Sequence, residues 1–241
     1  MSRLVVVSGA ASGIGRAAAR WFADAGDELY LLGRRRAPLE ALAAEVGGRA
    51  VPADLSTVDG ASAVAAAVGP RAVDVIVAAA GGTPATNPVG LDEVAHDWNA
   101  DVQQNLMTAV LLVEALKSRI ARPGGRVIGL GSIGAQLGSG YGGSYGAAKA
   151  ALHAWMYWLA QELGPQGVTA NLVLPGYVPD TEFFGDRVTE EFDRVRVERS
   201  LVGRAGTAAE IAATIGFLAS ADAGYITGQL IGVNGGMVLG R

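Results

Sequence analysis

Tyr145 and Lys149 are the residues of this chain whose types and spacing most directly suggest chemistry. They stand four residues apart in a stretch rich in helix-forming residues, so their side chains are expected one turn apart on the same helix face. A free phenol has a pKa of about 10, and a positive charge within roughly 4 to 6 Å lowers that pKa by about 1 to 3 units. The pair therefore predicts a phenol that exchanges protons near neutral pH, whereas the simpler interpretation is two polar groups on a helix surface.

A glycine-rich turn near the start of the chain is a second feature with chemical consequences. Residues 9–15 read Gly-Ala-Ala-Ser-Gly-Ile-Gly and stand between an apolar run and a helical stretch. At such a junction a doubly wound sheet presents backbone N–H groups and the positive end of a helix to a pyrophosphate. The spacing departs from the familiar Gly-x-Gly-x-x-Gly pattern, so the prediction rests on the position of the turn. The expected phosphate contacts are Gly9, Ser12, Gly13, Ile14 and Gly15.

Three consecutive arginines indicate which dinucleotide this turn would hold. A site for NAD places a carboxylate near the end of the second strand, where it binds the ribose hydroxyls and repels a 2′-phosphate. Here Gly33 occupies that position and Arg34, Arg35 and Arg36 follow it. Because guanidinium groups make bidentate contacts with phosphate, we predict NADP(H) in preference to NAD(H). The alternative is a solvated basic run at the start of a surface helix.

Strand-like and helical stretches alternate along the whole chain, and they must position these groups. The expected strands are residues 4–8, 28–33, 50–51, 73–79, 126–130, 168–174 and 230–233. The expected helices are residues 13–25, 38–46, 57–68, 91–120, 144–163 and 207–220. This alternation is typical of parallel strands joined by right-handed helical crossovers. We predict an α/β fold of the Rossmann type, with a doubly wound, seven-stranded parallel sheet flanked by helices on both faces, in a single domain over residues 1–241.

The composition of the chain argues against several other classes of function. The formal net charge is -4 at pH 7, there is no cysteine, and the two histidines, His96 and His153, stand far apart. We therefore expect no nucleic-acid partner, no disulfide or thiolate chemistry and no metal site. No apolar run approaches the ~18 residues of a membrane span, and the apolar start is too short for a signal peptide. We expect a cytoplasmic protein without a membrane partner.

Separated motifs along the chain resemble those of the short-chain dehydrogenase/reductase family. In order, they are Ser8-Gly9-x-x-x-Gly13-Ile14-Gly15, Asp54, Ala80-Gly81, Asn105, Ser132, Tyr145-x-x-x-Lys149, Pro175-Gly176 and Gly235-Gly236. The resemblance implies that Tyr145 exchanges a proton with the substrate oxygen as hydride moves to or from the nicotinamide, and that Ser132 hydrogen-bonds the same oxygen. It implies that Lys149 lowers the pKa of the phenol and holds the nicotinamide ribose. Asn105 would disturb its helix and position a water that relays protons to the lysine, although it can also be a polar residue on an exposed helix.

The resemblance extends to further cofactor contacts, with some departures. The residues expected there are Asp54 and Leu55 at the adenine, Ala80 and Gly81 at its ribose, and Pro175, Gly176 and Val178 beside the nicotinamide. By the same resemblance Arg34 is the best-placed ligand of the 2′-phosphate, and Arg35 is the next. Ser8 replaces the usual Thr, and Ala78 and Ala79 lack the side-chain amide that normally ties the central sheet together. Thr181 stands one residue further along the chain than usual, which puts its cofactor contact in doubt.

The substrate and partners are less constrained by the sequence. Phe183, Phe184 and Phe192 stand among many charges, which predicts one or two short amphipathic helices forming a substrate lid at about residues 177–202. The expected substrate contacts are Ser132, Gln136, Tyr141, Tyr145, Tyr177 and Phe183. The pattern is most similar to ketoreductases of the 3-oxoacyl-carrier-protein type. Arg126 stands where such enzymes often carry a basic residue that binds the acidic carrier protein, whereas Gln166 stands where a second basic residue is frequent. A carrier-tethered substrate and a free substrate are therefore both compatible with the sequence.

These features favour an NADP(H)-dependent carbonyl reductase or alcohol dehydrogenase that acts on a small-molecule ketone of the 3-oxoacyl or a related type. We expect a homotetramer or homodimer, because the helices at 91–120 and 144–163 are rich in apolar residues. One alternative is a dinucleotide-binding sensor or scaffold without turnover, against which Ser132, Tyr145 and Lys149 weigh. Others are a sugar, polyol or steroid-type alcohol dehydrogenase, and an enzyme of the same fold that performs an epimerisation or elimination.

Overall fold

Seven parallel strands form one sheet in the order β3-β2-β1-β4-β5-β6-β7 in the computed structural model, which describes residues 2–83, 88–138 and 143–240. The strands are β1 Leu4–Ser8, β2 Glu28–Gly33, β3 Arg49–Pro52, β4 Val75–Ala78, β5 Arg126–Leu130, β6 Thr169–Pro175 and β7 Leu230–Val233. From the middle of the sheet, β1, β2 and β3 follow one another toward one edge, and β4 to β7 follow one another toward the other edge. The strand order therefore reverses between the neighbouring strands β1 and β4. The predicted doubly wound, seven-stranded sheet is confirmed.

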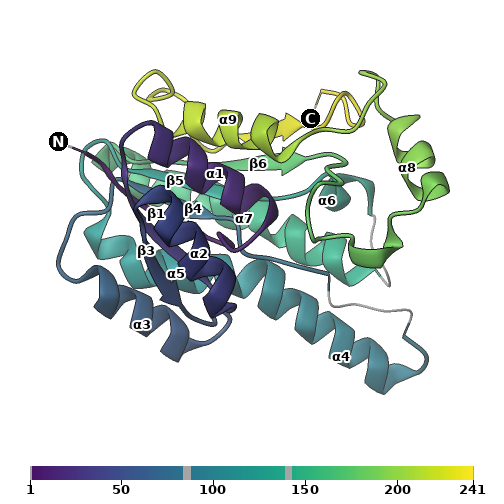
Figure 1. Cartoon of the computed structure of the whole chain (residues 1–241), viewed down its shortest axis with the longest axis horizontal. Helices are drawn as coiled ribbons and strands as arrows, with labels where there is room; N and C mark the ends of the chain where they lie inside the picture. Colours follow the sequence, from purple (N-terminus) through teal and green to yellow (C-terminus); the bar gives the residue numbers. More distant parts are fainter. Residues whose placement is uncertain (1, 84–87, 139–142, 241) are drawn as a thin grey trace.

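Helices cover both faces of this sheet (Figure 1). They are α1 Gly13–Asp24, α2 Arg36–Val46, α3 Val58–Val68, α4 Leu91–Val102, α5 Thr108–Leu116, α6 Gly134–Leu137, α7 Ser144–Leu163, α8 Glu190–Val197 and α9 Ala208–Leu218. One buried cluster joins α3, α5 and α7 to the sheet, and a second joins α1, α2 and α9 to its opposite face.

The sequence of β1 shows why the sheet has two cores. Its side chains alternate between faces, because successive residues of a strand point in opposite directions. Leu4 and Val6 belong to the cluster beneath α3, α5 and α7, whereas Val5 and Val7 belong to the cluster beneath α1, α2 and α9. A strand buried on both faces is apolar throughout, which is the pattern of a parallel sheet between helices.

The long helix predicted over residues 91–120 is divided in the structure. A π-helical turn, Gln103–Met107, separates α4 from α5, and a 3-10 turn, Lys117–Arg119, follows α5. Ile120 lies outside the helix and forms an isolated parallel bridge with Val73. The apolar pattern alone does not locate this interruption, whereas the resemblance predicts a disturbance of the helix at Asn105. Asn105 stands in the middle of this turn.

The segment after β6 extends past the carboxyl ends of the strands. It contains a 3-10 turn, Gly185–Arg187, and α8, whose N-cap Thr189 accepts a hydrogen bond from the backbone N–H of Phe192. In Figure 1 α8 lies near α6, beyond the same end of the sheet. Two short helical elements therefore occupy the region in which the lid is predicted. None of the helices in the described part of the chain is long and apolar enough to cross a membrane.

Ser8 ties the carboxyl ends of β1 and β4 together. Its Oγ accepts hydrogen bonds from the backbone N–H groups of Ala79 and Ala80, both at 3.0 Å, and the Ser8 side chain is fully buried. The hydroxyl thus supplies a contact between the central strands where Ala78 and Ala79 provide no side-chain amide.

We expect Ser8→Ala to lower the free energy of unfolding by about 1–3 kcal/mol, because the two N–H groups would lose their acceptor in a buried place. Urea denaturation measures the change. Ser8→Thr keeps the hydroxyl and serves as the control, with most of the stability retained. Equal destabilisation by both substitutions would contradict the role given to the hydroxyl.

Candidate active site

A cavity of about 440 Å³ opens at the carboxyl ends of the strands. It lies where the strand order reverses, which is where doubly wound sheets bind ligands. The predicted site residues that line it are Gly9, Ser12, Gly13, Ile14, Gly15, Arg34, Arg35, Gly81, Asn105, Ser132, Tyr145, Lys149, Pro175, Gly176, Val178 and Phe183. Residues that are distant in the sequence therefore meet in one place. Thr181, whose contact was in doubt, lines the same cavity.

A second cavity of about 160 Å³ adjoins the first and holds the predicted adenine-side residues. Asp54, Leu55 and Ala80 line it, and Gly81 and Arg34 line both cavities. Hydrogen bonds from the side chain and backbone of Ser56 lower the pKa of Asp54, so this carboxyl group is ionised. The two cavities give the site an extended shape with the catalytic candidates at one end.

The glycine turn brings the backbone close to both neighbouring segments. Gly9 has a φ of +68°, and a Cβ built on it would lie 2.7 Å from the carbonyl oxygen of Ala79. A Cβ on Gly15 would lie 2.3 Å from the carbonyl oxygen of Gly9, so only glycine fits there. Ser12 is the N-cap of α1, and within the described residues its side chain makes no capping hydrogen bond. The first N–H groups of α1 are thus left for another acceptor, which fits a pyrophosphate.

The arginines differ in their surroundings. Arg35 forms an ion pair of 2.6 Å with Glu182, which belongs to the segment after β6. Arg34 is exposed, and its charge helps to lower the pKa of Asp54. Arg36 pairs with Glu40 one turn along α2 and is absent from the lining of both cavities, as far as the described residues define them. Two of the three guanidinium groups therefore face the predicted dinucleotide site.

Tyr145 and Lys149 project from the first turns of α7, and both are buried, with 9 % and 4 % of their surface exposed. Lys149 Nζ donates a hydrogen bond of 2.9 Å to the carbonyl oxygen of Leu130, at the end of β5. A Cβ built on Gly81 would lie 2.9 Å from Asn105 Oδ1 and 3.2 Å from Lys149 Nζ. The missing side chain at Gly81 lets the amide of Asn105 and the ammonium of Lys149 come close to the strand end.

Burial controls the pKa values of this pair. It raises the pKa of Tyr145 to about 12, against the smaller, opposite effect of a hydrogen bond with the Ser132 side chain. The ring of Phe183, whose centroid is 5.4 Å from that of Tyr145, helps to enclose the phenol. Burial also lowers the pKa of Lys149 to about 8, while the charge of Asp101 acts in the opposite direction. The predicted lowering of the phenol pKa is therefore wrong for this enclosed arrangement, in which the Tyr145 phenol is protonated at neutral pH.

A third cavity, of about 420 Å³, lies on the other side of Tyr145 and is enclosed by the segment after β6. The predicted substrate contacts Ser132, Tyr145, Tyr177 and Phe183 line it. Gln136 lines none of the cavities found among the described residues, because α6 turns Ile133 and Leu137, four residues apart, toward the space. Tyr141 falls outside the described residues.

Aromatic rings dominate the wall of this substrate-side cavity. Phe184 contacts the rings of Phe183, Tyr177 and Phe192, with centroid separations of 5.0, 5.3 and 5.5 Å. The guanidinium of Arg196 stacks on the ring of Phe192 at 3.1 Å. The wall of this cavity is thus mainly apolar, with charged groups at its edge.

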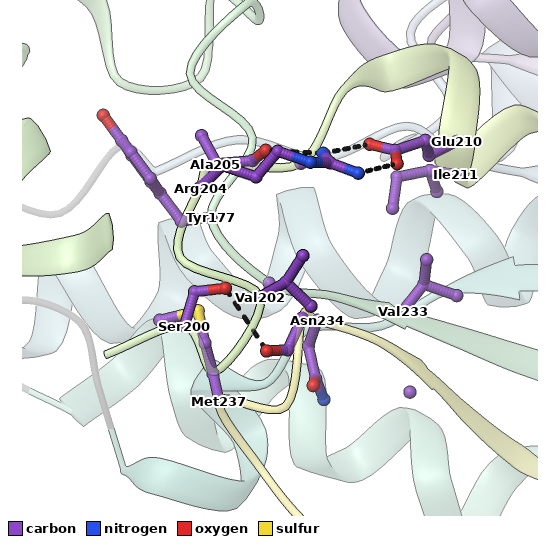
Figure 2. A pocket seen from close by; sticks show the side chains of 14 residues that line it. Tyr177, Ser200, Val202, Arg204, Ala205, Glu210, Ile211, Val233, Asn234 and Met237 are labelled. Atoms are coloured by element: carbon purple, nitrogen blue, oxygen red, sulfur yellow. Dashed lines mark hydrogen bonds and ion pairs between the residues drawn. The ribbon is translucent and has the colours of Figure 1, made fainter. Parts of the chain in front are cut away.

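A further cavity, of about 280 Å³, is lined by Gly176 and Tyr177 together with residues near the end of the chain. Figure 2 shows Tyr177, Ser200 and Asn234 around it. Arg204 and Glu210 face each other across its edge in a two-bonded ion pair of 2.6 and 3.0 Å. Ser200 Oγ donates to the carbonyl oxygen of Gly235 at 3.2 Å. These polar groups are satisfied by one another, and Ser132, Tyr145 and Lys149 do not line this cavity in the part of the chain described.

Asp101 and Ser144 are residues of the site that were not anticipated from the sequence. Asp101 Oδ2 accepts a hydrogen bond of 2.6 Å from Ser144 Oγ, and Asp101 Oδ1 accepts one of 3.1 Å from Asn105 Nδ2. The available signal was the spacing of Asp101 and Asn105, which places a carboxylate one turn from the amide on the same helix face.

Comparisons with known proteins find similar chains over almost the whole length of this one. Residues 9–238 match the model of a family described as enoyl-(acyl carrier protein) reductase. The chain is 32% identical to the 3-oxoacyl-(acyl-carrier-protein) reductase of Escherichia coli K12 over 98% of each chain. It is 33% identical to a short-chain reductase protein of Streptomyces niveus, over 97% of this chain and 93% of that one. A solved short-chain dehydrogenase/reductase, titled glucose/ribitol dehydrogenase, from Brucella melitensis superimposes with a TM-score of 0.90 at 30% identity, over 99% of this chain and 97% of that one.

The buried Lys149 predicts a specific dependence of stability on pH. Its pKa is about 8 in the folded chain and 10.5 as the ordinary value, so between these pH values the unfolded chain binds more protons. Stability therefore rises with pH across this window, by roughly 3 kcal/mol in total from this group. Urea titrations of the natural chain and of Lys149→Met, compared from pH 7 to 10.5, isolate the effect. A difference between the two proteins that stays constant across the window would contradict the burial of the ammonium.

Proposed function

The chain is an oxidoreductase that belongs to the short-chain dehydrogenase/reductase family, and we propose that it reduces a ketone with NADPH or oxidises the matching secondary alcohol with NADP⁺. The observation that carries this proposal is the position of Tyr145, which lines both the dinucleotide-side and the substrate-side cavity. Ser132 lines the same two cavities. A carbonyl oxygen held between these two hydroxyls would thus lie where the two cavities meet.

Each side chain has a definite task in the proposed reduction. A dinucleotide held by the glycine turn and by Arg34 and Arg35 would supply the hydride for the carbonyl carbon. Tyr145 gives its phenolic proton to the carbonyl oxygen, which becomes the alcohol, and Ser132 hydrogen-bonds that oxygen as charge develops on it. The ammonium of Lys149 stabilises the phenolate that remains, because opposite charges attract strongly away from water. The raised pKa of Tyr145 supports this direction, since the phenol is protonated at neutral pH.

Arg34 and Arg35 support NADP(H) as the dinucleotide. Both line the two cavities on the cofactor side, where a 2′-phosphate would extend from the adenosine ribose. Arg35 pairs there with the carboxylate of Glu182 at 2.6 Å, so its guanidinium lies where an anionic group can contact it. A phosphate would compete with Glu182 for the same charge.

The substrate-side cavity favours a ketone with an apolar body. Its wall contains three phenylalanines together with Leu137 and Met237, which favour burial of an apolar substrate body, and the arginines Arg187, Arg196 and Arg199 also line it. We propose a substrate of the 3-oxoacyl or a related type, which the similarity to a 3-oxoacyl reductase also supports.

Arg126 is only 8 % exposed and donates to the carbonyl oxygens of Gly124, Gly125 and Ser220, so it is not presented to an acidic carrier. This orientation favours a free substrate over a tethered one.

Exposed aromatic residues support a homotetramer or homodimer. Trp158 and Tyr157 on α7 are 47% and 43% exposed, and Trp98 on α4 is 42% exposed. Large apolar groups on two neighbouring helices are typical of surfaces that pack against another protein chain. We propose a second copy of this chain as the partner, within a single-domain protomer whose lid spans about residues 177–202.

The proton donor is tested by Tyr145→Phe. Absorbance at 340 nm, which follows NADPH, should fall when the natural protein meets a panel of ketones of increasing chain length. The variant should lose at least a hundredfold in rate while its affinity for NADPH is retained, because only the phenolic oxygen is removed. Normal turnover by the variant would show that another group donates the proton.

Cofactor choice is tested by replacing the arginines one at a time. Arg34→Ala and Arg35→Ala should each weaken NADPH binding by about tenfold or more, and leave NADH binding unchanged, because a phosphate–guanidinium pair is lost. Arg36→Ala removes the same charge outside the cavity lining and is the matched control. Equal losses for NADPH and NADH, or an equal loss in the control, would contradict phosphate recognition by Arg34 and Arg35.

A further inference from the structure

Asp101 is a fully buried carboxyl group, with 0 % of its surface exposed, at the end of α4 beside the catalytic candidates. Its two oxygens accept hydrogen bonds from two different elements. Asn105 Nδ2 in the π turn donates to Oδ1 at 3.1 Å, and Ser144 Oγ at the start of α7 donates to Oδ2 at 2.6 Å. A buried acid is costly unless it is bonded and balanced by charge, so this arrangement needs an explanation beyond helix packing.

The bond to Asn105 fixes which way its amide points. A carboxylate accepts hydrogen bonds only, so the group of Asn105 that faces Asp101 must be the NH₂. The carbonyl oxygen of the amide, Asn105 Oδ1, then faces the other way and accepts from the backbone N–H of Gly82 at 3.1 Å. This oxygen is the same atom that lies against Gly81 together with Lys149 Nζ. Asp101 therefore determines that Asn105 presents an acceptor, and not a donor, toward the ammonium side of the site.

The bond to Ser144 connects the same carboxyl group to the helix that carries the reacting phenol. Ser144 is the first residue of α7 and directly precedes Tyr145. It is 1 % exposed, so its hydroxyl has no access to bulk water. One carboxyl group thus joins the π turn to the start of α7, the two elements that hold Asn105 and Tyr145.

Charged and titratable groups surround Asp101 on both helices. Asp97, one turn earlier on α4, raises the pKa of Asp101, and burial raises it further, whereas the bonds from Ser144 and Asn105 and the charge of Lys149 lower it. In return, the charge of Asp101 raises the pKa values of Lys149 and Tyr145. Lys149 is otherwise bonded to a neutral carbonyl group, that of Leu130. The Asn105 amide connects the two groups, because its NH₂ donates to Asp101 and its oxygen lies with Lys149 Nζ against Gly81. The negative charge of Asp101 therefore acts on the ammonium across one side-chain amide.

We propose that Asp101 is a positioning residue of this active site, which holds the amide of Asn105 and the start of α7 in place and supplies the buried counter-charge of Lys149. Only the catalytic part of this role rests on the proposed reduction of a ketone. The effect on Lys149 depends only on the folded chain, in which the Asn105 amide lies between the carboxyl group and the surroundings of Lys149 Nζ. It can therefore be measured without turnover.

The composition of the chain provides a direct test, because Lys117 and Lys149 are its only lysines. Incorporation of lysine labelled with ¹³C at the ε carbon gives two lysine signals by nuclear magnetic resonance, and their chemical shifts follow each titration. In the natural chain the midpoint of Lys149 should lie near 8. Asp101→Asn should lower that midpoint by about one pH unit, because a nearby negative charge is removed. Lys117, which pairs with Glu114 and Glu162, is the internal control and should not shift.

The same variants have a catalytic readout. Asp101→Asn should move the basic limb of the pH profile for ketone reduction to lower pH by about one unit, since the pKa values of Lys149 and Tyr145 both fall when Asp101 loses its charge. Ser144→Ala keeps the charge and removes one bond. It should lower kcat about tenfold with little change in the KM for NADPH, and leave the Lys149 midpoint near its natural value.

The outcomes separate this proposal from the proposed function. An unchanged Lys149 midpoint in Asp101→Asn overturns the counter-charge role, whatever the enzyme reduces. If the midpoint shifts but no ketone is reduced by the natural chain, the proposed function fails and the role of Asp101 toward Lys149 stands. If Asp101→Asn does not fold, Ser144→Ala still decides, because natural kcat in that variant contradicts the tie between Asp101 and the start of α7.

Discussion

The withdrawal of an ammonium and a phenol from water is the constraint on which the rest of this site depends. Lys149 and Tyr145 lie one turn apart on α7 and are almost completely buried, so each is held in a protonation state set by its enclosure. Burial without compensation would neutralise the ammonium. The carbonyl oxygen of Leu130 and the charge of Asp101 offset that tendency. The ammonium of Lys149 stabilises the phenolate form of Tyr145, because opposite charges attract strongly away from water. The phenol therefore gives up its proton more easily than it would without this cation.

The fold provides this enclosure at the carboxyl ends of the central strands of the sheet. Residues at the carboxyl ends of β1, β4, β5 and β6 meet there because all seven strands run in the same direction. Glycines at two of these ends, Gly9 and Gly81, let backbone and side chains come within van der Waals contact of one another. The segment after β6 closes the other side with Phe183, so that a dinucleotide and a carbonyl compound would meet at Tyr145 from opposite cavities.

The sequence patterns predicted the structure best where a feature depends on a local run of residues within one helix or strand. The bounds of β2, β5, β7 and α7 agree with the predicted ones, because apolar runs and a glycine-bounded helix leave little choice. Patterns were less informative where the outcome depends on distant neighbours. The burial that raises the pKa of Tyr145 and the inward orientation of Arg126 both arise from tertiary packing. Asp101 was overlooked for the same reason, since an acid on a polar helix is ordinarily solvated, and only the approach of Ser144 makes it part of the site.

The central claim is that hydride reaches a carbonyl carbon whose oxygen takes its proton at Tyr145. Transfer of the label from NADPH deuterated at C4 of the nicotinamide ring tests this most directly, with a ketone that the enzyme accepts and mass spectrometry of the product alcohol. We predict that one of the two C4-labelled stereoisomers delivers a single deuterium to the carbinol carbon, while the new hydroxyl hydrogen comes from solvent. Product alcohol without deuterium at that carbon from either stereoisomer would contradict the account.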